Sequence, residues 1–251
     1  MRCGFRAGLA VAAVLVATAA HPARAQEQVD LLLVLAADVS RSMDNAEFQM
    51  QRQGYVDALT NPRVLDAIRS GVNQRIAATF IEWSGVGSQK VVVDWSIISD
   101  EATARRFADE LAEAPRSFAG RTSISGALDF SVDHLDRAPY EAQRRTIDVS
   151  GDGMNNSGRF ITLARNNAVA KGVTINGLVV AADAQEPGNP ERPDSRQELT
   201  TYYRDYVIGG PGAFVMVAES FDSFGQALIN KLVAEIAQVS WRRHAALGAR
   251  R

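Results

Sequence analysis

Apolar runs and helical patterns alternate along the chain. The stretch from Val29 to Ala37 is almost continuously apolar, which is typical of a strand covered on both faces. Asp44 and Glu47 then form a capping-box pattern, in which a helix begins after Asp44. The apolar residues of this helix share one face: Phe48, Tyr55, Val56 and Leu59. The sequence therefore predicts a buried strand followed at once by an amphipathic helix.

The same alternation continues to the end of the chain. Residues 75–83 and 90–98 predict two strands that meet at a glycine turn, a hairpin that places one antiparallel strand at the edge of the sheet. Three further strands are predicted at 146–149, 174–182 and 213–218. Helices are predicted at 62–71, from 100, at 124–137, at 158–170, before 213, and over the final stretch that contains Leu228, Leu232, Ile236 and Val239. This order predicts an α/β fold with a doubly wound, mostly parallel sheet, one antiparallel edge strand and helices on both faces.

Residues 1–25 have the composition of a secretory signal peptide. Arg2 and Arg6 precede an apolar run at 9–20, and Ala23 and Ala25 supply the small residues that a signal peptidase accepts. A run of 12 residues is too short to span a bilayer, and no later stretch approaches membrane-spanning length. We therefore expect a periplasmic or secreted protein with no transmembrane segment after cleavage. Its expected parts are a signal peptide at 1–25, one folded domain at 26–241 and a basic tail at 242–251.

Cleavage would also change the composition of the chain. Cys3 is the only cysteine, so the mature chain would have no disulfide, no thiolate metal site and no cysteine nucleophile. Three of the 27 Lys and Arg residues lie in the signal peptide and none of the 29 Asp and Glu residues does, which gives the mature chain a net charge of −5. A chain of this charge is not expected to bind nucleic acid.

Polar side chains directly follow the first buried strand. Asp38, Ser40 and Ser42 supply one carboxylate and two hydroxyls at alternate positions of a turn. Asp152 follows the strand predicted at 146–149, and in a doubly wound sheet both positions lie at the carboxyl edge, where ligands bind. A buried carboxylate is costly without a partner, so we expect one here. Ligands that are all oxygen favour a hard cation, and Mg2+ needs few side chains because it keeps several waters.

These residues resemble the metal ion-dependent adhesion site of von Willebrand factor type A domains. The resemblance rests on Asp38, Ser40 and Ser42 in "DVSRS", Thr122 in "GRTSISGAL" and Asp152 in "SGDG", and it covers nearly the whole mature chain. It implies a Rossmann-like fold that holds one divalent cation, with Mg2+ expected and Mn2+ or Ca2+ as alternatives. It also implies that the two serines and the threonine reach the cation directly or through water, while the two aspartates share direct and water-mediated roles.

The resemblance implies a binding function. Two carboxylates balance the charge of a divalent cation, which can then accept an Asp or Glu side chain of a protein partner in its open position. The loop at 183–197, which contains three prolines, is expected to select the partner. Arg121 precedes Thr122 where many relatives have glycine, and it could either shield the cation or help to hold the incoming carboxylate.

Two alternatives use the same fold. A metal-dependent hydrolase would use the cation to activate water or to polarise a phosphate, and a scaffold would work without metal. The sequence offers no evident general base, because the mature histidines, His134 and His244, lie in charged stretches where a solvated surface position is expected. It also contains no GxSxG motif. We therefore expect a protein-binding module that is not an enzyme.

Overall fold

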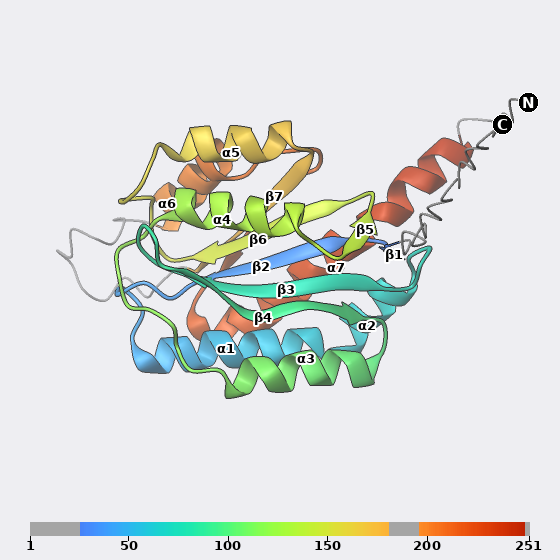
Figure 1. Cartoon of the computed structure of the whole chain (residues 1–251), viewed down its shortest axis with the longest axis horizontal. Coiled ribbons are helices and arrows are strands. Elements are labelled where there is room, and N and C mark those ends of the chain that lie inside the picture. The colour runs from blue at the N-terminus through green and yellow to red at the C-terminus, as the bar shows by residue number, and fades with distance from the viewer. Residues whose placement is uncertain (1–25, 181–195, 249–251) are drawn as a thin grey trace, which may run out of the picture.

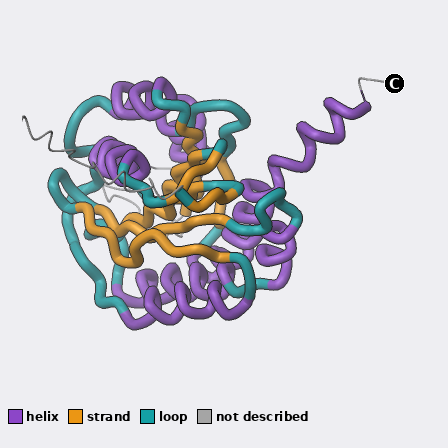
Figure 2. Tube along the Cα trace, turned by 45° about the vertical axis from the view of Figure 1, so that its right-hand side comes forward, coloured by secondary structure: helices purple, strands orange, loops and turns teal. Residues whose placement is uncertain are grey.

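A six-stranded sheet with the strand order β4-β3-β2-β6-β7-β8 lies between two layers of helices (Figures 1 and 2). The computed structural model describes residues 26–180 and 196–248, and side chains up to residue 237. The strands of the main sheet are β2 (Leu32–Asp38), β3 (Ile76–Trp83), β4 (Gln89–Ile98), β6 (Arg145–Gly151), β7 (Val173–Val180) and β8 (Val215–Ala218). A separate two-stranded sheet consists of β1 (Glu27–Val29) and β5 (Tyr140–Ala142).

The structure confirms the predicted doubly wound fold. β2, β3, β6, β7 and β8 are parallel, and β4 pairs antiparallel with β3 at the edge of the sheet. One face of the sheet is covered by α1 (Asn45–Leu59), α2 (Pro62–Arg69), α3 (Glu101–Glu113) and α7 (Phe221–Gly248). The other face is covered by α4 (Ile124–Asp136), α5 (Ile161–Ala170), α6 (Arg196–Tyr202) and the π-helix η1 (Tyr203–Val207).

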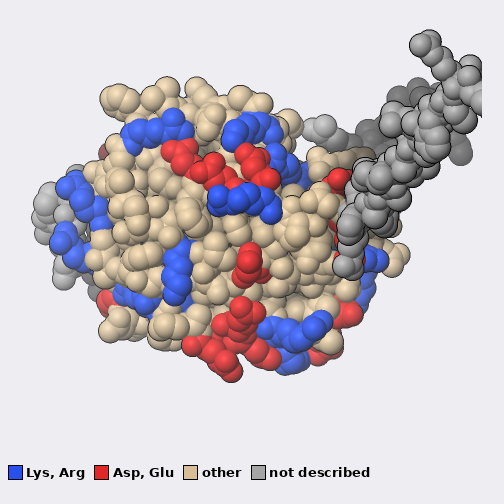
Figure 3. All heavy atoms as spheres, viewed as in Figure 1, with Lys and Arg blue, Asp and Glu red and all other residues tan. Residues whose placement is uncertain are grey.

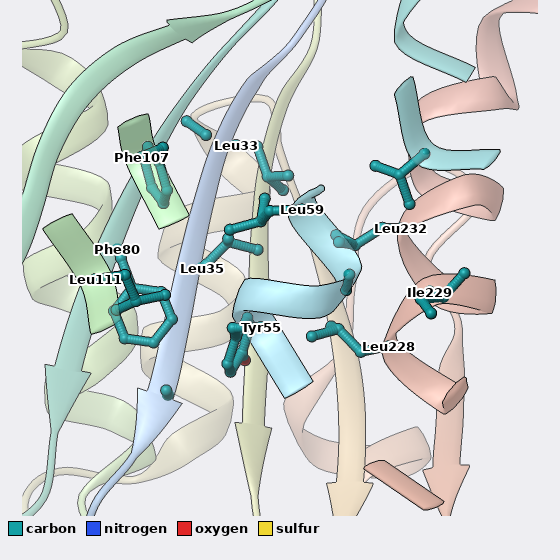
Figure 4. Packing of buried hydrophobic residues seen from close by; sticks show 14 of the residues in the cluster. Leu33, Leu35, Tyr55, Leu59, Phe80, Phe107, Leu111, Leu228, Ile229 and Leu232 are labelled. Atoms are coloured by element: carbon teal, nitrogen blue, oxygen red, sulfur yellow. The ribbon is translucent and has the colours of Figure 1, made fainter. Parts of the chain in front are cut away.

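β2 shows why its sequence is apolar at nearly every position. Leu33 and Leu35 pack against the layer that contains α1, α3 and α7 (Figure 4), whereas Leu32 and Val34 pack against the opposite layer. No residue of β2 exposes more than 3 % of its surface. Successive side chains of a strand point to opposite faces, so a central strand with helices on both sides has no position left for water.

The strand order reverses at β2, and this reversal positions the candidate site. The chain leaves β2 to form β3 on one side and later returns to form β6 on the other. The carboxyl ends of β2 and β6 therefore lie side by side, at the left of Figure 1. Asp38 ends β2, and Asp152 follows Gly151, the last residue of β6. In doubly wound sheets this reversal is the usual position of a ligand site.

Some boundaries differ from the sequence prediction. The apolar stretch predicted as one strand is divided, because β1 pairs with β5 in the small sheet and β2 begins only at Leu32. The helix predicted from about Gly158 begins at Ile161. Gly158 adopts a left-handed φ of 89°, which is not compatible with a right-handed helix. The predicted signal peptide and most of the loop at 183–197 lie outside the described residues.

The C-terminal helix is longer than predicted. α7 continues to Gly248, so helical backbone extends into the predicted basic tail, and its last turns project beyond the sheet (Figures 1 and 2). Neither α7 nor any other helix within 26–180 and 196–248 combines the length and the apolar composition that crossing a membrane requires.

The surface over α4 and α5 has a mixed charge. Basic and acidic side chains are interspersed on the face drawn in Figure 3. Arg159 pairs with Asp129 at 2.5 Å, and Asp136 pairs with both Arg145 and Lys171 at 2.5 and 2.8 Å. These ion pairs connect α4 to the start of α5, to β6 and to the end of α5, so opposite charges offset one another across this layer.

Candidate metal centre

The loop after β2 is folded tightly around Asp38. The Asp38 side chain is buried, and its Oδ1 atom accepts a hydrogen bond of 2.7 Å from the backbone N–H of Ser40. This local bond turns the chain so that the hydroxyls of Ser40 and Ser42 lie 3.0 Å apart. The backbone N–H of Arg41 donates to the carbonyl of Gly120 at 2.9 Å, which ties the loop to the segment that follows α3.

The structure brings the five predicted residues together. Ser40 Oγ lies 3.0 Å from Ser42 Oγ and 3.5 Å from Thr122 Oγ1. Ser42 Oγ donates to Asp152 Oδ1 at 2.8 Å. Asp38 and Asp152 are close enough for their charges to repel. Two carboxylates and three hydroxyls from three separate loops thus form one cluster of oxygens at the carboxyl edge of the sheet.

Burial disfavours the ionised form of Asp38 in this cluster. Burial, and then the charge of Asp152, raise the pKa of Asp38 well above its usual range. Asp38 Oδ2 is buried and accepts no hydrogen bond from any described residue. Two ionised carboxylates in such a site are mutually destabilising, and a cation between them would remove that cost. The donor set therefore fits a hard divalent cation.

The hydroxyl groups are essential to this fit. Among the described residues, no group of three or more His, Cys, Asp or Glu side chains is placed to hold a metal ion. The cluster contains only two such side chains, Asp38 and Asp152, so a cation there would also need the oxygens of Ser40, Ser42 and Thr122. Neutral oxygen ligands are normal for Mg2+, which needs six oxygens and takes several of them from water.

Arg116 braces the loop after β2, although no sequence motif predicted this role. Its guanidinium donates to three carbonyls of this loop, those of Val39 (3.0 Å), Ser40 (2.8 Å) and Met43 (3.0 Å). Its Nε atom donates to the carbonyl of Phe118 at 3.0 Å. The guanidinium donates from Nη2 to the loop after β2 and from Nε to Phe118, and the single nitrogen of a lysine cannot reproduce both. No motif marks Arg116 because all the hydrogen bonds described for it go to backbone carbonyls.

Asn156 holds the loop that carries Thr122. The backbone N–H of Asn156 donates to the carbonyl of Thr122 at 2.9 Å, and Asn156 Oδ1 accepts from the backbone N–H of Thr122 at 3.0 Å. Arg121 lies exposed beside this pair, and its guanidinium donates to the carbonyl of Asn156 at 2.9 Å. In the structure Arg121 thus connects two loops at the rim of the site, a contact that the sequence did not suggest.

Gly151 has a steric role that a turn glycine would not have. It is the last residue of β6, and a Cβ atom at this position would lie 2.7 Å from the hydroxyl of Tyr203 and 3.2 Å from Asp38 Oδ2. Only glycine leaves room for both side chains to approach the strand. Tyr203 belongs to η1 and was not among the predicted site residues, because nothing in its sequence position links it to Asp38.

His134 is largely buried, which corrects the predicted surface position. Its ring stacks on Trp95 with the ring centroids 5.3 Å apart, and its Nε2 atom lies 3.2 Å from Thr79 Oγ1. The side chain is 12 % exposed, and burial lowers its pKa below the usual value. His134 therefore packs α4 against β3 and β4. The side chain of His244 lies outside the described residues.

The sequence model of a protein family matches most of the chain. The family is described as "Protein of unknown function (DUF1194)", the match covers residues 28–240, and the chain belongs to this family. No curated protein matches the sequence.

Several solved structures share the fold. A pilus adhesin, SpaC, from Lactobacillus rhamnosus GG is 15 % identical with a TM-score of 0.59, over 84 % of this chain and 31 % of that chain. A von Willebrand factor type A structure from Catenulispora acidiphila is 15 % identical with a TM-score of 0.54, over 83 % and 42 %. Proximal thread matrix protein 1 from the mussel byssus, with a zinc-occupied metal ion-dependent adhesion site motif, is 16 % identical with a TM-score of 0.52, over 83 % and 46 %. The chain therefore has the von Willebrand factor type A fold, and it spans less than half of each of these structures.

Proposed function

We propose that the domain is an exported, cation-dependent protein-binding module. A divalent cation, Mg2+ in the first instance, is held by Asp38, Ser40, Ser42, Thr122 and Asp152, and it accepts an Asp or Glu side chain of a partner protein. The observation that carries this proposal is the buried Asp38 carboxylate, whose Oδ2 atom accepts no hydrogen bond from the described residues although it lies in a cluster of oxygens. A buried carboxylate in that state calls for a positive partner.

Charge balance supports an acidic ligand. The five side chains carry at most two negative charges, and the three hydroxyls are neutral, so a divalent cation brings the site to about zero net charge. The bound cation supplies a strong electrostatic attraction for one further oxygen ligand, and a carboxylate is the protein side chain that gains most from it. Proximal thread matrix protein 1 from the mussel byssus, which shares the fold and whose metal ion-dependent adhesion site motif is occupied by zinc, supports divalent cation binding.

The rim of the site offers apolar surface for a protein partner. Val86, in the turn between β3 and β4, is 64 % exposed, and Phe160, just before α5, is 79 % exposed. These two segments meet near Gly158, where an added Cβ atom would lie 3.3 Å from Val86 Cγ2. Large apolar side chains that neither fill the core nor cap a helix are typical of protein contact surfaces.

Calorimetric titration of the mature chain with MgCl2 tests cation binding. We expect one site in the unsubstituted chain and no measurable site in Asp38→Asn or Asp152→Asn. Asp66→Asn is a matched control, because the Asp66 side chain is 75 % exposed on α2 and should leave binding unchanged. Equal Mg2+ binding by Asp38→Asn and the unsubstituted chain would exclude the proposed site, whereas no binding by the unsubstituted chain would favour a scaffold that works without metal.

A peptide display experiment tests the nature of the partner. Random peptides are bound to the immobilised chain in MgCl2 and released with EDTA. We expect released peptides to share an Asp or Glu, and their binding to require Asp38. Release of peptides without a common acidic residue would contradict the proposed recognition. Magnesium-dependent hydrolysis of phosphoester or peptide substrates, lost in Asp152→Asn, would instead identify a hydrolase.

A further inference from the structure

Tyr203 has a buried hydroxyl that nothing in the described structure satisfies. The residue is completely buried in the core layer beneath α4 and α5, yet its hydroxyl forms no hydrogen bond with any described residue. Buried hydroxyls nearly always have a partner in folded proteins, so an exception calls for an explanation. A phenylalanine would fill the same apolar space without this cost, and the hydroxyl therefore needs a reason of its own.

Two strand glycines make room for this side chain. A Cβ atom at Gly177 in β7 would lie 2.9 Å from Tyr203 Cδ1, and a Cβ atom at Gly151 in β6 would lie 2.7 Å from the Tyr203 hydroxyl. Glycine weakens the interior of a strand, and here it occurs on adjacent strands at the two points where the tyrosine passes. The ring packs over Gly177 and the hydroxyl over Gly151, where neither glycine has a side chain in the way.

The hydroxyl points to the candidate metal centre. The same Cβ position at Gly151 would lie 3.2 Å from Asp38 Oδ2, so the phenol oxygen and this carboxylate oxygen border one small space above the strand. Asp38 Oδ2 is likewise buried without a hydrogen bond from the described residues.

The π-helix orients the side chain. The backbone N–H of Ile208 donates to the carbonyl of Tyr203 at 2.9 Å, the i to i+5 bond that defines η1. Tyr203 and Val207 lie buried against the sheet, while Tyr206 is 48 % exposed on the opposite side. Single π-turns are uncommon and frequently occur at functional sites. This wide turn is the element that directs Tyr203 toward Asp38.

We propose that Tyr203 is a further residue of the cation site, where its hydroxyl and Asp38 Oδ2 together hold a water molecule of the cation's hydration shell. The inference rests on the cation binding proposed above. The Tyr203 hydroxyl then links η1 to the site, so that cation binding stabilises residues 203–208. A neutral acceptor for a proton of a cation-bound water also favours cations that retain their hydration, and Mg2+ does so more strongly than Ca2+.

Calorimetric titration of Tyr203→Phe with MgCl2 tests the proposal. We expect the Mg2+ affinity of this variant to fall about threefold to tenfold, which corresponds to the loss of one modest hydrogen bond. Its metal-free thermal stability should equal or exceed that of the unsubstituted chain, because an unsatisfied hydroxyl has been removed. Tyr206→Phe is the matched control, since it removes an exposed hydroxyl from the same turn and should change neither quantity.

Hydrogen exchange provides a readout that a purely structural tyrosine would not change. At saturating MgCl2 we expect slower exchange at residues 203–208 in the unsubstituted chain, and no such protection in Tyr203→Phe. Exchange that is independent of magnesium in the unsubstituted chain would overturn the proposal, even if the variant were too unstable to titrate. Mg2+ binding with equal affinity in both chains would overturn the role of Tyr203 alone, whereas no Mg2+ binding in the unsubstituted chain would overturn the proposed function itself.

Discussion

Ser42 Oγ donates a hydrogen bond of 2.8 Å to Asp152 Oδ1, and the two residues are 110 positions apart in the sequence. This bond joins the loop after β2 to the loop after β6 across the point where the strand order reverses. It also brings oxygens of the two loops together at one point, because the hydroxyl of Ser42 offers Asp152 a donor. A cation would compete with this bond for the same oxygen atoms.

Removing the charge of Asp38 should stabilise the metal-free domain and abolish its response to magnesium. In EDTA we expect Asp38→Asn to unfold with a free energy about 1 kcal/mol or more above that of the unsubstituted chain, because the repulsion with Asp152 is lost. In MgCl2 at a hundred times the Kd, only the unsubstituted chain should gain about 2.7 kcal/mol. Urea denaturation measures both effects. A large magnesium gain in Asp38→Asn would contradict the assignment.

Replacing Arg116 by lysine should loosen the loop after β2 while keeping the positive charge. We expect the free energy of unfolding to fall by about 1 to 2 kcal/mol and the Mg2+ affinity to fall several-fold, because one ammonium nitrogen cannot replace both the Nη2 contacts with the loop and the Nε bond to Phe118. Calorimetry and urea denaturation measure the two quantities. Arg63→Lys is the control, since Arg63 is exposed and bonds only to Asn230 among the described contacts. Unchanged affinity in Arg116→Lys would show that the brace serves stability alone.

A methyl group at Gly151 should disturb the candidate site sterically. We expect Gly151→Ala to lower the free energy of unfolding by about 1 to 3 kcal/mol and to weaken Mg2+ binding, because the added atom meets Tyr203 and Asp38. Gly85→Ala is the control, since the nearest atom to its added Cβ is 3.5 Å away. Thermal unfolding with and without MgCl2 separates the two effects. If Gly151→Ala binds Mg2+ as tightly as the unsubstituted chain, the close approach at this strand end does not matter for the site.

A buried charged cluster connects β6 to α7. Lys231 Nζ lies 2.5 Å from Asp148 Oδ1 and 2.6 Å from Glu235 Oε1, and all three side chains are fully buried. Asn176 Nδ2 donates to Glu235 Oε1 at 2.6 Å. Burial, and then the charge of Glu235, raise the pKa of Asp148 from 3.8 to about 7.

This cluster predicts how stability depends on pH. The pKa of Asp148 is higher in the folded than in the unfolded chain, so its protonation stabilises the fold fully below about pH 4 and this contribution is lost as the pH rises through about 7. Asp148→Asn removes the titration. We therefore expect the stability of the variant relative to the unsubstituted chain to rise as the pH increases from about 4 to about 7, as measured by urea denaturation. Parallel pH profiles for the two chains would contradict the raised pKa.

Phe160 should contribute to partner binding and not to folding. Its side chain is 79 % exposed and makes no capping hydrogen bond at the start of α5. We expect Phe160→Ser to change the free energy of unfolding by less than about 0.5 kcal/mol and to leave Mg2+ binding intact. The same variant should bind the peptides selected in magnesium at least several-fold more weakly. Fluorescence polarisation with labelled peptides measures this, and an unchanged affinity would place the partner elsewhere on the rim.

Local features of the sequence predicted most of the fold. The capping box of Asp44 and Glu47 is present with both hydrogen bonds at 2.8 Å. The apolar run that became β2 is buried at every position, and the hairpin forms the antiparallel edge. Such features depend on neighbouring residues, which a single sequence displays directly. The exceptions were also local in cause, as where Gly158 delays the start of α5.

The sequence by itself determined the order of strands and helices, and with it the edge at which Asp38 and Asp152 would meet, because alternating elements fold into a sheet with one reversal. Only the tertiary structure decided which residues support them. Arg116 donates to backbone carbonyls, Tyr203 packs where two strand glycines have no side chain, and His134 stacks on Trp95. These contacts join residues far apart in the chain, and they depend on packing distances that no local pattern records.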